Sequence, residues 1–307
     1  MYHIIVNPAS KSGLGRTKWK ELKKLLLKEM VTYNVQFTTP EHMSAYKCVR
    51  QLTSKDFPKP LHLIVLGGDG TINEVLNGIQ DFENTILTYL PAGSSNDLAR
   101  DMEVNTMPAA LLYKCLKTKQ CCLMDYGTTH YKGGKRRFLV SSGIGFDAEV
   151  CNQALHSTLK NVLNLFHLGK LTYGLIAIKL LFQTKPVSAE IYLDGSETPI
   201  RVKRLLFCAA MNHRYEGGGF MFAPDADATD GSLDICLVSD IKLYRVIYLL
   251  PLALKGKHRG HKGIQIFSAK DVTVKTSIPL TVHTDGEICG KFNSLHLTCT
   301  KQALKYV

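Results

Sequence analysis

The sequence lacks an apolar run long enough to cross a bilayer. Its most apolar stretches are Leu171–Ile178, which Lys179 closes, and Val246–Leu254. Both fall well short of the roughly 20 residues that a membrane-spanning helix needs. We therefore expect no transmembrane segment, and any contact with a membrane should be peripheral.

Paired cysteine motifs are also absent, although the chain has nine cysteines. There is no Cys-X-X-Cys pair, and the adjacent Cys121 and Cys122 suit neither a common disulfide nor a zinc site. We expect reduced thiols in a cytoplasmic protein. The first ten residues, MYHIIVNPAS, lack the charged start and apolar core of a secretion signal.

Acidic residues are fewer than basic ones, since 26 Asp and Glu stand against 38 Lys and Arg. The formal net charge of +12 favours anionic partners such as phosphorylated ligands and acidic lipid surfaces. Basic residues cluster at Lys132–Arg137 and Lys255–Lys262. Because no RNP-like aromatic motif or basic zipper accompanies them, we expect no nucleic-acid partner.

The first 120 or so residues alternate strand and helix patterns. The predicted strands are residues 2–7, 31–39, 61–68 and 85–93, and the predicted helices are residues 17–30, 44–52, 71–78 and 95–102. Such alternation is typical of a mainly parallel sheet with helices on both faces. It predicts an α/β domain over residues 1–122.

The pattern changes near residue 122, after which strands dominate. The predicted strands are residues 124–131, 136–145, 188–194, 204–212, 232–239, 271–277, 280–286 and 294–300. A helical stretch at about residues 148–182 interrupts them. This indicates a second domain, residues 123–300, with a β-sandwich fold and a helical insertion.

Three glycine-containing loops follow predicted strands of the first domain, at Asn7–Gly15, Gly67–Gly78 and Pro91–Arg100. They contain neither the GxxxxGK[ST] motif of P-loop proteins nor the GxGxxG dinucleotide motif. In a parallel sheet such loops gather at one edge, where glycines and free helix amides favour anions. Serine and threonine hydroxyls add donors, so together the loops fit a triphosphate.

A carboxylate in the second loop needs an explanation. Beside a phosphate, Asp69 would be repelled by about 4 kcal/mol at ~4 Å and an effective dielectric of ~20. A Mg²⁺ ion between the two would offset this, as would a substrate hydroxyl that gives Asp69 its proton. Asp97 follows the next strand, where it either shares this role or only satisfies amides at a helix start.

Two further acidic turns lie in the second half. Asp225, Asp227 and Asp230 precede Gly231 without EF-hand spacing, so they form either a plain turn or a small cation site. At residues 282–290 the sequence VHTDGEICG predicts a hairpin. A type I′ turn explains its Asp-Gly pair but does not require Glu287.

In this order, the motifs NPASKSG, GGDGTINEVLNG, PAGSSNDLAR, GIGFDAEV, DGSLDICLV and TDGE resemble the diacylglycerol kinase catalytic family, in its bacterial soluble lipid-kinase branch. That family includes sphingosine and ceramide kinases and is distantly related to NAD kinases. The resemblance implies an α/β nucleotide-binding domain and a C-terminal β-sandwich with the active site between them. It also implies that residues 301–307 return to the first domain.

The resemblance assigns roles to individual residues. It implies that Glu287 is the proton acceptor, that Asp69 is essential and close to it, and that Asp97 links the site through waters to a structural Mg²⁺. Asp230 would hold this ion by its carboxylate, and Asp227 and Ser232 by backbone oxygens. ATP would contact residues of the loops, namely Asn7, Ser10, Ser12, Thr38 or Thr39, Gly67, Gly68, Asp69, Gly70, Thr71, Asn73 and Ser94.

The sequence departs from the family pattern at two places. Lys11 is an extra residue in the first loop, and Gly-Ser-Ser in the third loop replaces the usual Gly-Thr. Serine keeps the hydroxyl, so the second change should matter little. The inserted lysine leaves open how Ser10 and Ser12 contact phosphate.

The expected function is an ATP- and Mg²⁺-dependent lipid kinase at an anionic membrane surface. Diacylglycerol is the acceptor expected first, while phosphatidylglycerol, sphingoid bases and other lipid alcohols stay open. An apolar stretch around Leu163–Phe182 frames either a lipid groove or an ordinary core helix. The alternatives are an NAD kinase-like enzyme and a non-catalytic nucleotide sensor, and a homodimer is left open.

Overall fold

The computed structural model describes residues 1–41, 43–54, 59–104, 106–117, 120–156, 176–185 and 187–307. The chain forms two compact units. Unit 1 comprises Met1–Asp125 and Gln302–Val307, and unit 2 comprises Tyr126–Lys301. Most of the predicted stretch at Leu163–Phe182 lies outside the described residues.

Unit 1 is built on a parallel sheet. Its strands lie in the order β13-β4-β3-β1-β2, and each neighbouring pair runs parallel. Its elements are β1 (Tyr2–Val6), α1 (Ser10–Lys28), β2 (Tyr33–Phe37), α2 (Ser44–Leu52), β3 (Leu61–Gly67), α3 (Asp69–Gly78), β4 (Thr85–Pro91), α4 (Asp97–Asp101) and α5 (Pro108–Lys117). Strand and helix alternate as predicted.

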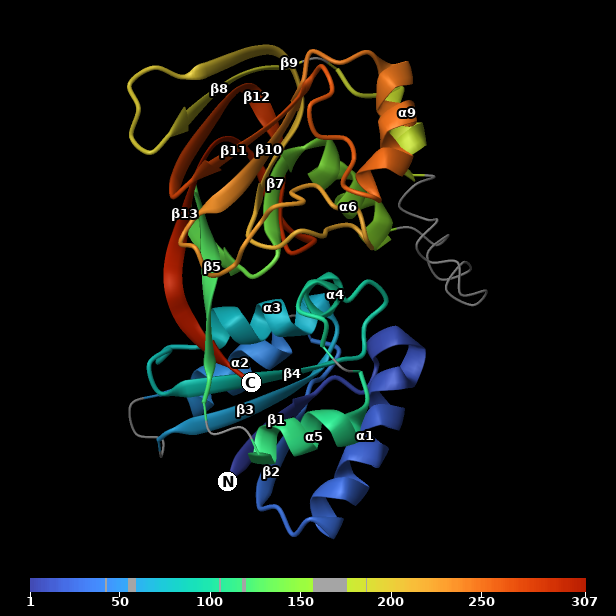
Figure 1. Ribbon diagram of the computed structural model, residues 1–307, viewed down its shortest axis with the longest axis vertical. Coiled ribbons are helices and arrows are strands. Elements are labelled where there is room, and N and C mark those ends of the chain that lie inside the picture. The colour runs from blue at the N-terminus through green and yellow to red at the C-terminus, as the bar shows by residue number, and fades with distance from the viewer. Residues whose placement is uncertain (42, 55–58, 105, 118–119, 157–175, 186) are drawn as a thin grey trace. The chain divides into compact units, whose positions relative to one another are not determined.

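Helices cover both faces of this sheet (Figure 1). Alternate strand residues such as Ile4 and Ile64 face one side, where they pack with Trp19 and Leu22 of α1 and Leu111 of α5. Helices α2 and α3 pack together on the other face. Because both faces are covered, the strands read as nearly continuous apolar runs.

The end of the chain completes the sheet of unit 1. Lys305 and Tyr306, at the end of β13 (Glu287–Tyr306), pair in parallel with Ile86 and Leu87 of β4. Leu304 is fully buried at this point. The last residues therefore belong to the core of unit 1.

Unit 2 is an antiparallel β structure. Its strands lie in the order β11-β10-β9-β7-β12-β13, while β8 pairs with both β9 and β12, and β5 pairs with β6 and β13. Its strands are β5 (Cys122–Tyr131), β6 (Gly134–Phe138), β7 (Ser141–Gly145), β8 (Val187–Leu193), β9 (Ile200–Met211), β10 (Leu233–Ser239), β11 (Ile264–Ala269), β12 (Asp271–Thr284) and β13.

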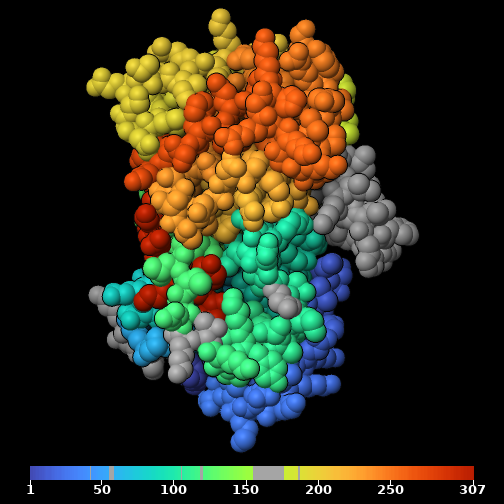
Figure 2. All heavy atoms as spheres, in the orientation of Figure 1, coloured from blue at the N-terminus to red at the C-terminus, as the bar shows by residue number. Residues whose placement is uncertain are grey.

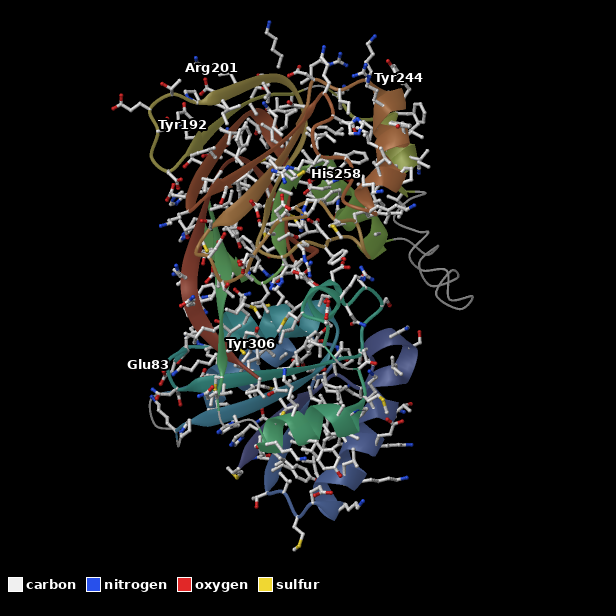
Figure 3. All side chains as sticks on the ribbon, in the orientation of Figure 1. Glu83, Tyr192, Arg201, Tyr244, His258 and Tyr306 are labelled. Carbon is white, nitrogen blue, oxygen red and sulfur yellow. The ribbon has the colours of Figure 1, made fainter. Side chains whose placement is uncertain are left out.

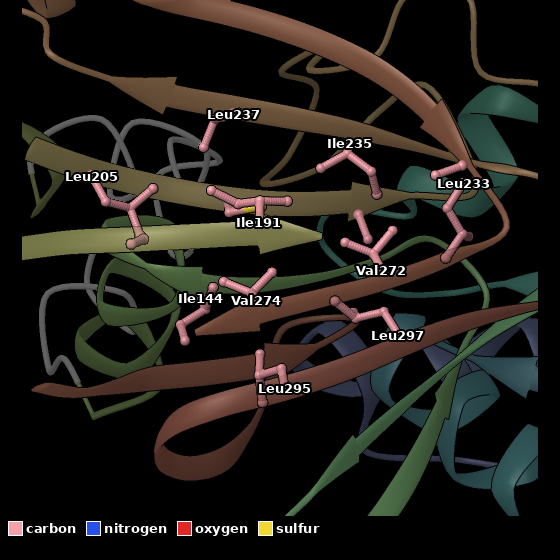
Figure 4. Packing of buried hydrophobic residues seen from close by; sticks show 14 of the residues in the cluster. Ile144, Ile191, Leu205, Leu233, Ile235, Leu237, Val272, Val274, Leu295 and Leu297 are labelled. Atoms are coloured by element: carbon pink, nitrogen blue, oxygen red, sulfur yellow. The ribbon is translucent and has the colours of Figure 1, made fainter. Parts of the chain in front are cut away.

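Two long strands fold this sheet over its own core. One part of β9 pairs with β8 and the other with β7, and β12 divides itself between the same two partners. A register shift between Lys275 and Leu280 bends β12 where it changes partner. The enclosed core includes Ile191, Ile235 and Val272 (Figure 4).

A second apolar cluster lies between this sheet and the helices of unit 2. Helix α6 (Phe146–His156), helical residues 176–181 and α9 (Leu243–Ala253) pack there against β9 and β10. Among the described residues, none of the helices combines the length and the apolar content that a bilayer crossing requires.

Several boundaries differ from the sequence prediction. The predicted strand 136–145 is two strands, β6 and β7, and the predicted strands 271–277 and 280–286 are one strand, β12. Helices α5 and α9 and strand β11 were not predicted. The first helix is assigned from Ser10 rather than residue 17, and α4 covers only Asp97–Asp101.

The buried chain end gives a stability prediction. Leu304→Ala should lower the free energy of unfolding by about 2–5 kcal/mol, because it removes buried methyl groups and leaves a cavity. Trp19 is the only tryptophan and is buried in unit 1, so its fluorescence during urea unfolding reports this loss. Leu27→Ala, at a side chain 62% exposed in the same unit, is the control and should change little.

Candidate active site

The first and second loops of unit 1 are joined by hydrogen bonds. Strands β1 and β3 are parallel neighbours, so their loops leave from the same edge of the sheet. The Asn7 amide Nδ2 donates to Thr71 Oγ1 at 3.0 Å, and the Asn7 N–H donates to the Leu66 carbonyl at 2.8 Å. Asn7 therefore fixes the first loop to the start of α3.

The second and third loops approach at two glycines. The Ala92 N–H donates to the Gly67 carbonyl at 2.6 Å. A Cβ on Gly93 would lie 2.7 Å from Gly68 Cα, and a Cβ on Gly68 would lie 3.0 Å from Gly93 Cα. Only glycine allows the two backbones to come this close, and backbones free of side chains are what phosphate-binding loops need.

The third loop is closed by one side chain. Asn96 Oδ1 accepts the Gly93 N–H at 2.8 Å, and Asn96 Nδ2 donates to the Gly93 carbonyl at 3.0 Å. Asn96 itself has a φ of 50°, which asparagine tolerates better than most residues. Ser94 is thereby left exposed at the tip of the loop.

The first loop contains a left-handed turn around the inserted lysine. Lys11, Ser12 and Gly13 have φ values of 43°, 54° and 97°, so regular helical geometry begins only after them. The Ser10 hydroxyl donates to the Asn7 carbonyl at 2.9 Å and holds the loop, whereas Ser12 is exposed. Of the two serines, Ser12 is therefore the one that presents its side chain to solvent.

The end of β2 lies beside the end of β1. The Thr38 N–H donates to the Val6 carbonyl at 2.9 Å, which brings both predicted threonines to the same edge. The Thr39 N–H donates to Ser44 Oγ at 2.9 Å, at the start of α2. Asn73, another predicted ATP contact, is fully buried, and the Asn77 amide donates to its carbonyl at 2.9 Å.

Asp69 and Asp97 both lie near one buried phenol. Tyr89 donates to the Gly67 carbonyl at 3.3 Å. Burial, and then the charges of Asp69 and Asp97, raise the pKa of Tyr89 well above its usual range. The charges of both predicted carboxylates therefore act on the same buried phenol in unit 1.

Asp97 follows the capping position of its helix. The capping position of α4 belongs to Asn96, without a side-chain capping bond, and Asp97 is the first helical residue. The Asp97 carboxylate is buried and accepts a hydrogen bond from the Arg100 guanidinium at 2.7 Å. Its local role is thus an ion pair with Arg100.

Glu287 directly follows a two-residue turn in unit 2. Thr284 of β12 pairs with Glu287 of β13, and the intervening Asp285 and Gly286 have φ values of 49° and 82°. Positive φ at both residues is the geometry of a type I′ hairpin. The sequence prediction of this hairpin turn agrees with the structure.

The Asp285 carboxylate holds this turn against the segment that connects β6 to β7. It accepts the N–H groups of Leu139, Val140 and Ser141 at 2.9, 2.8 and 3.0 Å. Hydrogen bonds to an ionised acceptor are stronger than those between neutral groups. Three charge-assisted hydrogen bonds therefore fix the backbone of the turn that precedes Glu287.

His283 connects the same turn to two buried carboxylates. The Gly286 N–H donates to His283 Nδ1 at 3.2 Å, so the ring proton lies on Nε2. Nε2 in turn is 3.2 Å from Asp147 Oδ2 and 3.1 Å from Glu216 Oε1. Burial raises the pKa of Asp147, and at His283 burial is outweighed by the charge of Glu216 and the hydrogen bonds of the two carboxylates, which raise the pKa.

The spacing of this cluster also resembles a metal site. Ligand atoms of Cys151, Glu216 and His283 lie within 4.8 Å of one another, and all three residues are buried. The bond from Gly286 to Nδ1 leaves the proton on Nε2, which then has no lone pair for a metal ion. The geometry is that of a hydrogen-bonded cluster.

The predicted Mg²⁺ ligands share one exposed turn. Asp227 Oδ1 accepts the Thr229 N–H at 2.9 Å, and Asp230 Oδ1 accepts the Ser232 N–H at 2.7 Å. Burial, and then the charge of Asp230, raise the pKa of Asp234 to about 6. An exposed, oxygen-rich turn of this kind fits a hard cation such as Mg²⁺.

Comparisons with known proteins cover the whole chain. The profile of the diacylglycerol kinase catalytic domain matches residues 1–128, and that of the YegS C-terminal NAD kinase beta sandwich-like domain matches residues 140–307. YtlR of Bacillus subtilis, named as a lipid kinase, is 30% identical over 94% of both chains. The chain belongs to the diacylglycerol kinase family.

The kinase is also similar to further members of this family. The diacylglycerol kinase of Bacillus subtilis is 28% identical over 74% of this chain and 71% of its own. A crystal structure from Bacillus anthracis, described as a diacylglycerol kinase, covers 100% of this chain and 94% of its own, with a TM-score of 0.77 and 23% identity. This last likeness shows the shared fold, and the predicted fold class is confirmed.

The sequence analysis assigned no role to four residues of the His283 cluster and the acidic turn. They are Asp147, Glu216, Asp234 and His283. Asp147 lies in GIGFDAEV, Asp234 in DGSLDICLV and His283 two residues before Asp285, so three of them lie in or beside quoted motifs. Glu216 lies in none, and only the fold brings it to His283.

The contribution of the Asp285 carboxylate to stability can be tested separately from the turn preference of the Asp-Gly pair. Asn-Gly forms a type I′ turn as well as Asp-Gly, so Asp285→Asn removes the charge and keeps the turn preference. We expect a loss of about 2–3 kcal/mol in unfolding free energy, measured by circular dichroism in urea. Asp194→Asn, at an exposed Asp-Gly pair whose carboxylate accepts two amides, should lose less. Equal stability of Asp285→Asn and wild type would show that the carboxylate contributes nothing.

Asp234 predicts a pH dependence of stability. Because its folded pKa is raised to about 6, the folded state holds the proton more tightly than the unfolded state, and stability falls as pH rises from about 4 to 6. Asp234→Asn removes the ionisable group and with it this loss of stability at higher pH. Its melting temperature should match wild type near pH 4 and exceed it at pH 7. A difference that is the same at both pH values would contradict the assignment.

Proposed function

We propose that this kinase transfers the γ-phosphate of ATP to a lipid hydroxyl in a Mg²⁺-dependent reaction, with diacylglycerol as the acceptor expected first. The observation that carries the nucleotide part is the joining of three loops at one sheet edge through Asn7, Gly68 and Gly93. In the proposal these backbones and hydroxyls hold the triphosphate, and the enzyme works from the cytoplasm at a membrane surface.

The proposed chemistry needs a base and a positioned phosphate. The lipid oxygen attacks the γ-phosphorus, the bond to the β–γ bridging oxygen breaks, and ADP leaves. The hydroxyl proton passes to the Glu287 carboxylate, or to Asp69. Since the transition state of phosphoryl transfer is loose, positioning and charge neutralisation supply most of the acceleration.

Magnesium has two parts in the proposal. The Asp230 carboxylate and main-chain oxygens of Asp227 and Ser232 would hold one ion at their turn, which is rich in oxygen ligands. Mg²⁺ bound with ATP supplies neutralisation of phosphate charge. The residues of the chain bind, orient and accept the proton.

The lipid part of the proposal rests on a cavity in unit 2. Its open space is about 90 Å³, and its walls are mainly apolar. Side chains from α6, β9, β10 and α9 line it, among them Phe146, Val150, Phe207, Val238 and Leu249. Apolar walls of this kind suit the acyl part of a lipid and not a soluble dinucleotide.

The first test follows labelled γ-phosphate into a panel of acceptors. Diacylglycerol, phosphatidylglycerol and sphingosine are offered in mixed micelles, and NAD is offered without lipid. Label in one lipid supports the proposal and names the acceptor. Label in NAD alone would favour an NAD kinase-like enzyme, and ATP binding without transfer to any acceptor would favour a sensor.

Two carboxylate variants test the assigned roles. Asp69→Asn and Glu287→Gln should each lower the transfer rate by about 10²–10⁴-fold, the usual contribution of an acid or base. Glu83→Gln in unit 1 and Glu197→Gln in unit 2 are the controls, because both side chains are exposed (Glu83 is labelled in Figure 3). If a site variant keeps the wild-type rate while folded, its residue does not have the role proposed here.

A further inference from the structure

Helix α9 is apolar on all sides although half of it faces solvent. Its eleven residues, LYRVIYLLPLA, include one charged residue, Arg245. Leu243 and Ile247 are each 40% exposed, and Tyr244 and Tyr248 are each 62% exposed. Their spacing of four residues places these side chains on one face of the helix, which we call the outer α9 face.

The opposite side of α9 forms a wall of the lipid cavity. Val246, Leu249 and Ala253 are buried and line that cavity together with Leu250. In Figure 3, Tyr244 lies at the outer edge of unit 2, whereas His258 lies toward its interior. One helix thus separates the cavity from an exposed apolar face.

Basic residues surround the outer α9 face. Residues 242–262 contain six Lys and Arg and no Asp or Glu, and they form part of the surface drawn in orange in Figure 2. Arg259 pairs with Asp225. Lys242, Lys255 and Lys257 are exposed beside the helix.

We propose that the outer α9 face docks on an anionic bilayer surface. Tyrosine rings favour the interface between acyl chains and head groups, and the leucine and isoleucine side chains lose water when they enter it. Each nearby lysine or arginine should add about fivefold to the partition onto anionic lipid at low salt. Docking in this way would put the wall of the cavity against the membrane that contains the substrate.

A second copy of this chain fits the same face less well. A two-fold dimer brings the same patch of both copies together. Here it would set two basic segments without acidic residues against each other, and like charges repel. Charge complementarity therefore favours anionic lipid. The inference rests on the proposed function in one respect, namely that the substrate is a lipid of the bilayer.

Docking is tested without ATP, by sedimentation with vesicles of phosphatidylcholine alone or with about one third phosphatidylglycerol. Wild type should bind the anionic vesicles, more weakly at high salt. The double variant Ile247→Asn and Tyr248→Ser should partition onto the anionic vesicles at least tenfold more weakly than wild type. The double variant Lys255→Gln and Lys257→Gln should also bind the anionic vesicles more weakly, while its partition onto phosphatidylcholine vesicles should equal that of wild type. Ile278→Asn, at a side chain 49% exposed elsewhere in unit 2, is the control.

Separate measurements distinguish a failure of membrane docking from a failure of the proposed kinase function. Phosphate transfer to diacylglycerol in detergent micelles tests the function, and it should persist in the α9 double variant, whose substituted residues do not line the cavity. Melting temperatures confirm that each variant is folded. Equal vesicle binding by wild type and the double variant would overturn the inference, as would a dimer in light scattering that the double variant converts to monomer.

Discussion

The placement of carboxylates in buried or partly buried positions is the constraint on which the candidate site depends in both units. A buried carboxylate is costly unless donors compensate its charge. The partly buried Asp285 therefore receives three amides, Asp97 receives a guanidinium, and one oxygen each of Asp147 and Glu216 faces the imidazole of His283. The bonds to Asp285 and His283 hold the turn that carries Glu287, and the bond from Arg100 holds the Asp97 carboxylate in the third loop.

In unit 2, this constraint connects the apolar cavity to the Glu287 turn. Asp147 and Glu216 line the cavity, and their common partner His283 accepts the Gly286 amide beside Glu287. The cavity wall and the turn thus form one hydrogen-bonded unit. Helix α9 closes another side of the same cavity with residues that alternate between its inner and outer faces. A lipid in the cavity would be held by elements that also position the proposed base.

The sequence predicts those parts of the fold that depend on local patterns of apolar and polar residues. Alternating strands and helices fix the parallel sheet of unit 1, and the bounds of α2, Ser44–Leu52, agree in full. Helix α9 was not predicted because periodicity alone does not distinguish a short, mostly apolar run from a buried strand. The bend in β12 makes one strand look like two separate strands in the sequence. The bonds from Leu139–Ser141 to Asp285 join residues about 145 positions apart, and no local pattern reports such a contact.

The central claim is that the acceptor of the γ-phosphate is a lipid hydroxyl. Phosphorus NMR of the purified protein with ATP, Mg²⁺ and diacylglycerol in micelles tests it most directly, because every phosphorus species appears in one spectrum. The account predicts one phosphomonoester of the lipid for each ADP that forms. ADP accompanied only by inorganic phosphate, with no new phosphomonoester, would contradict it.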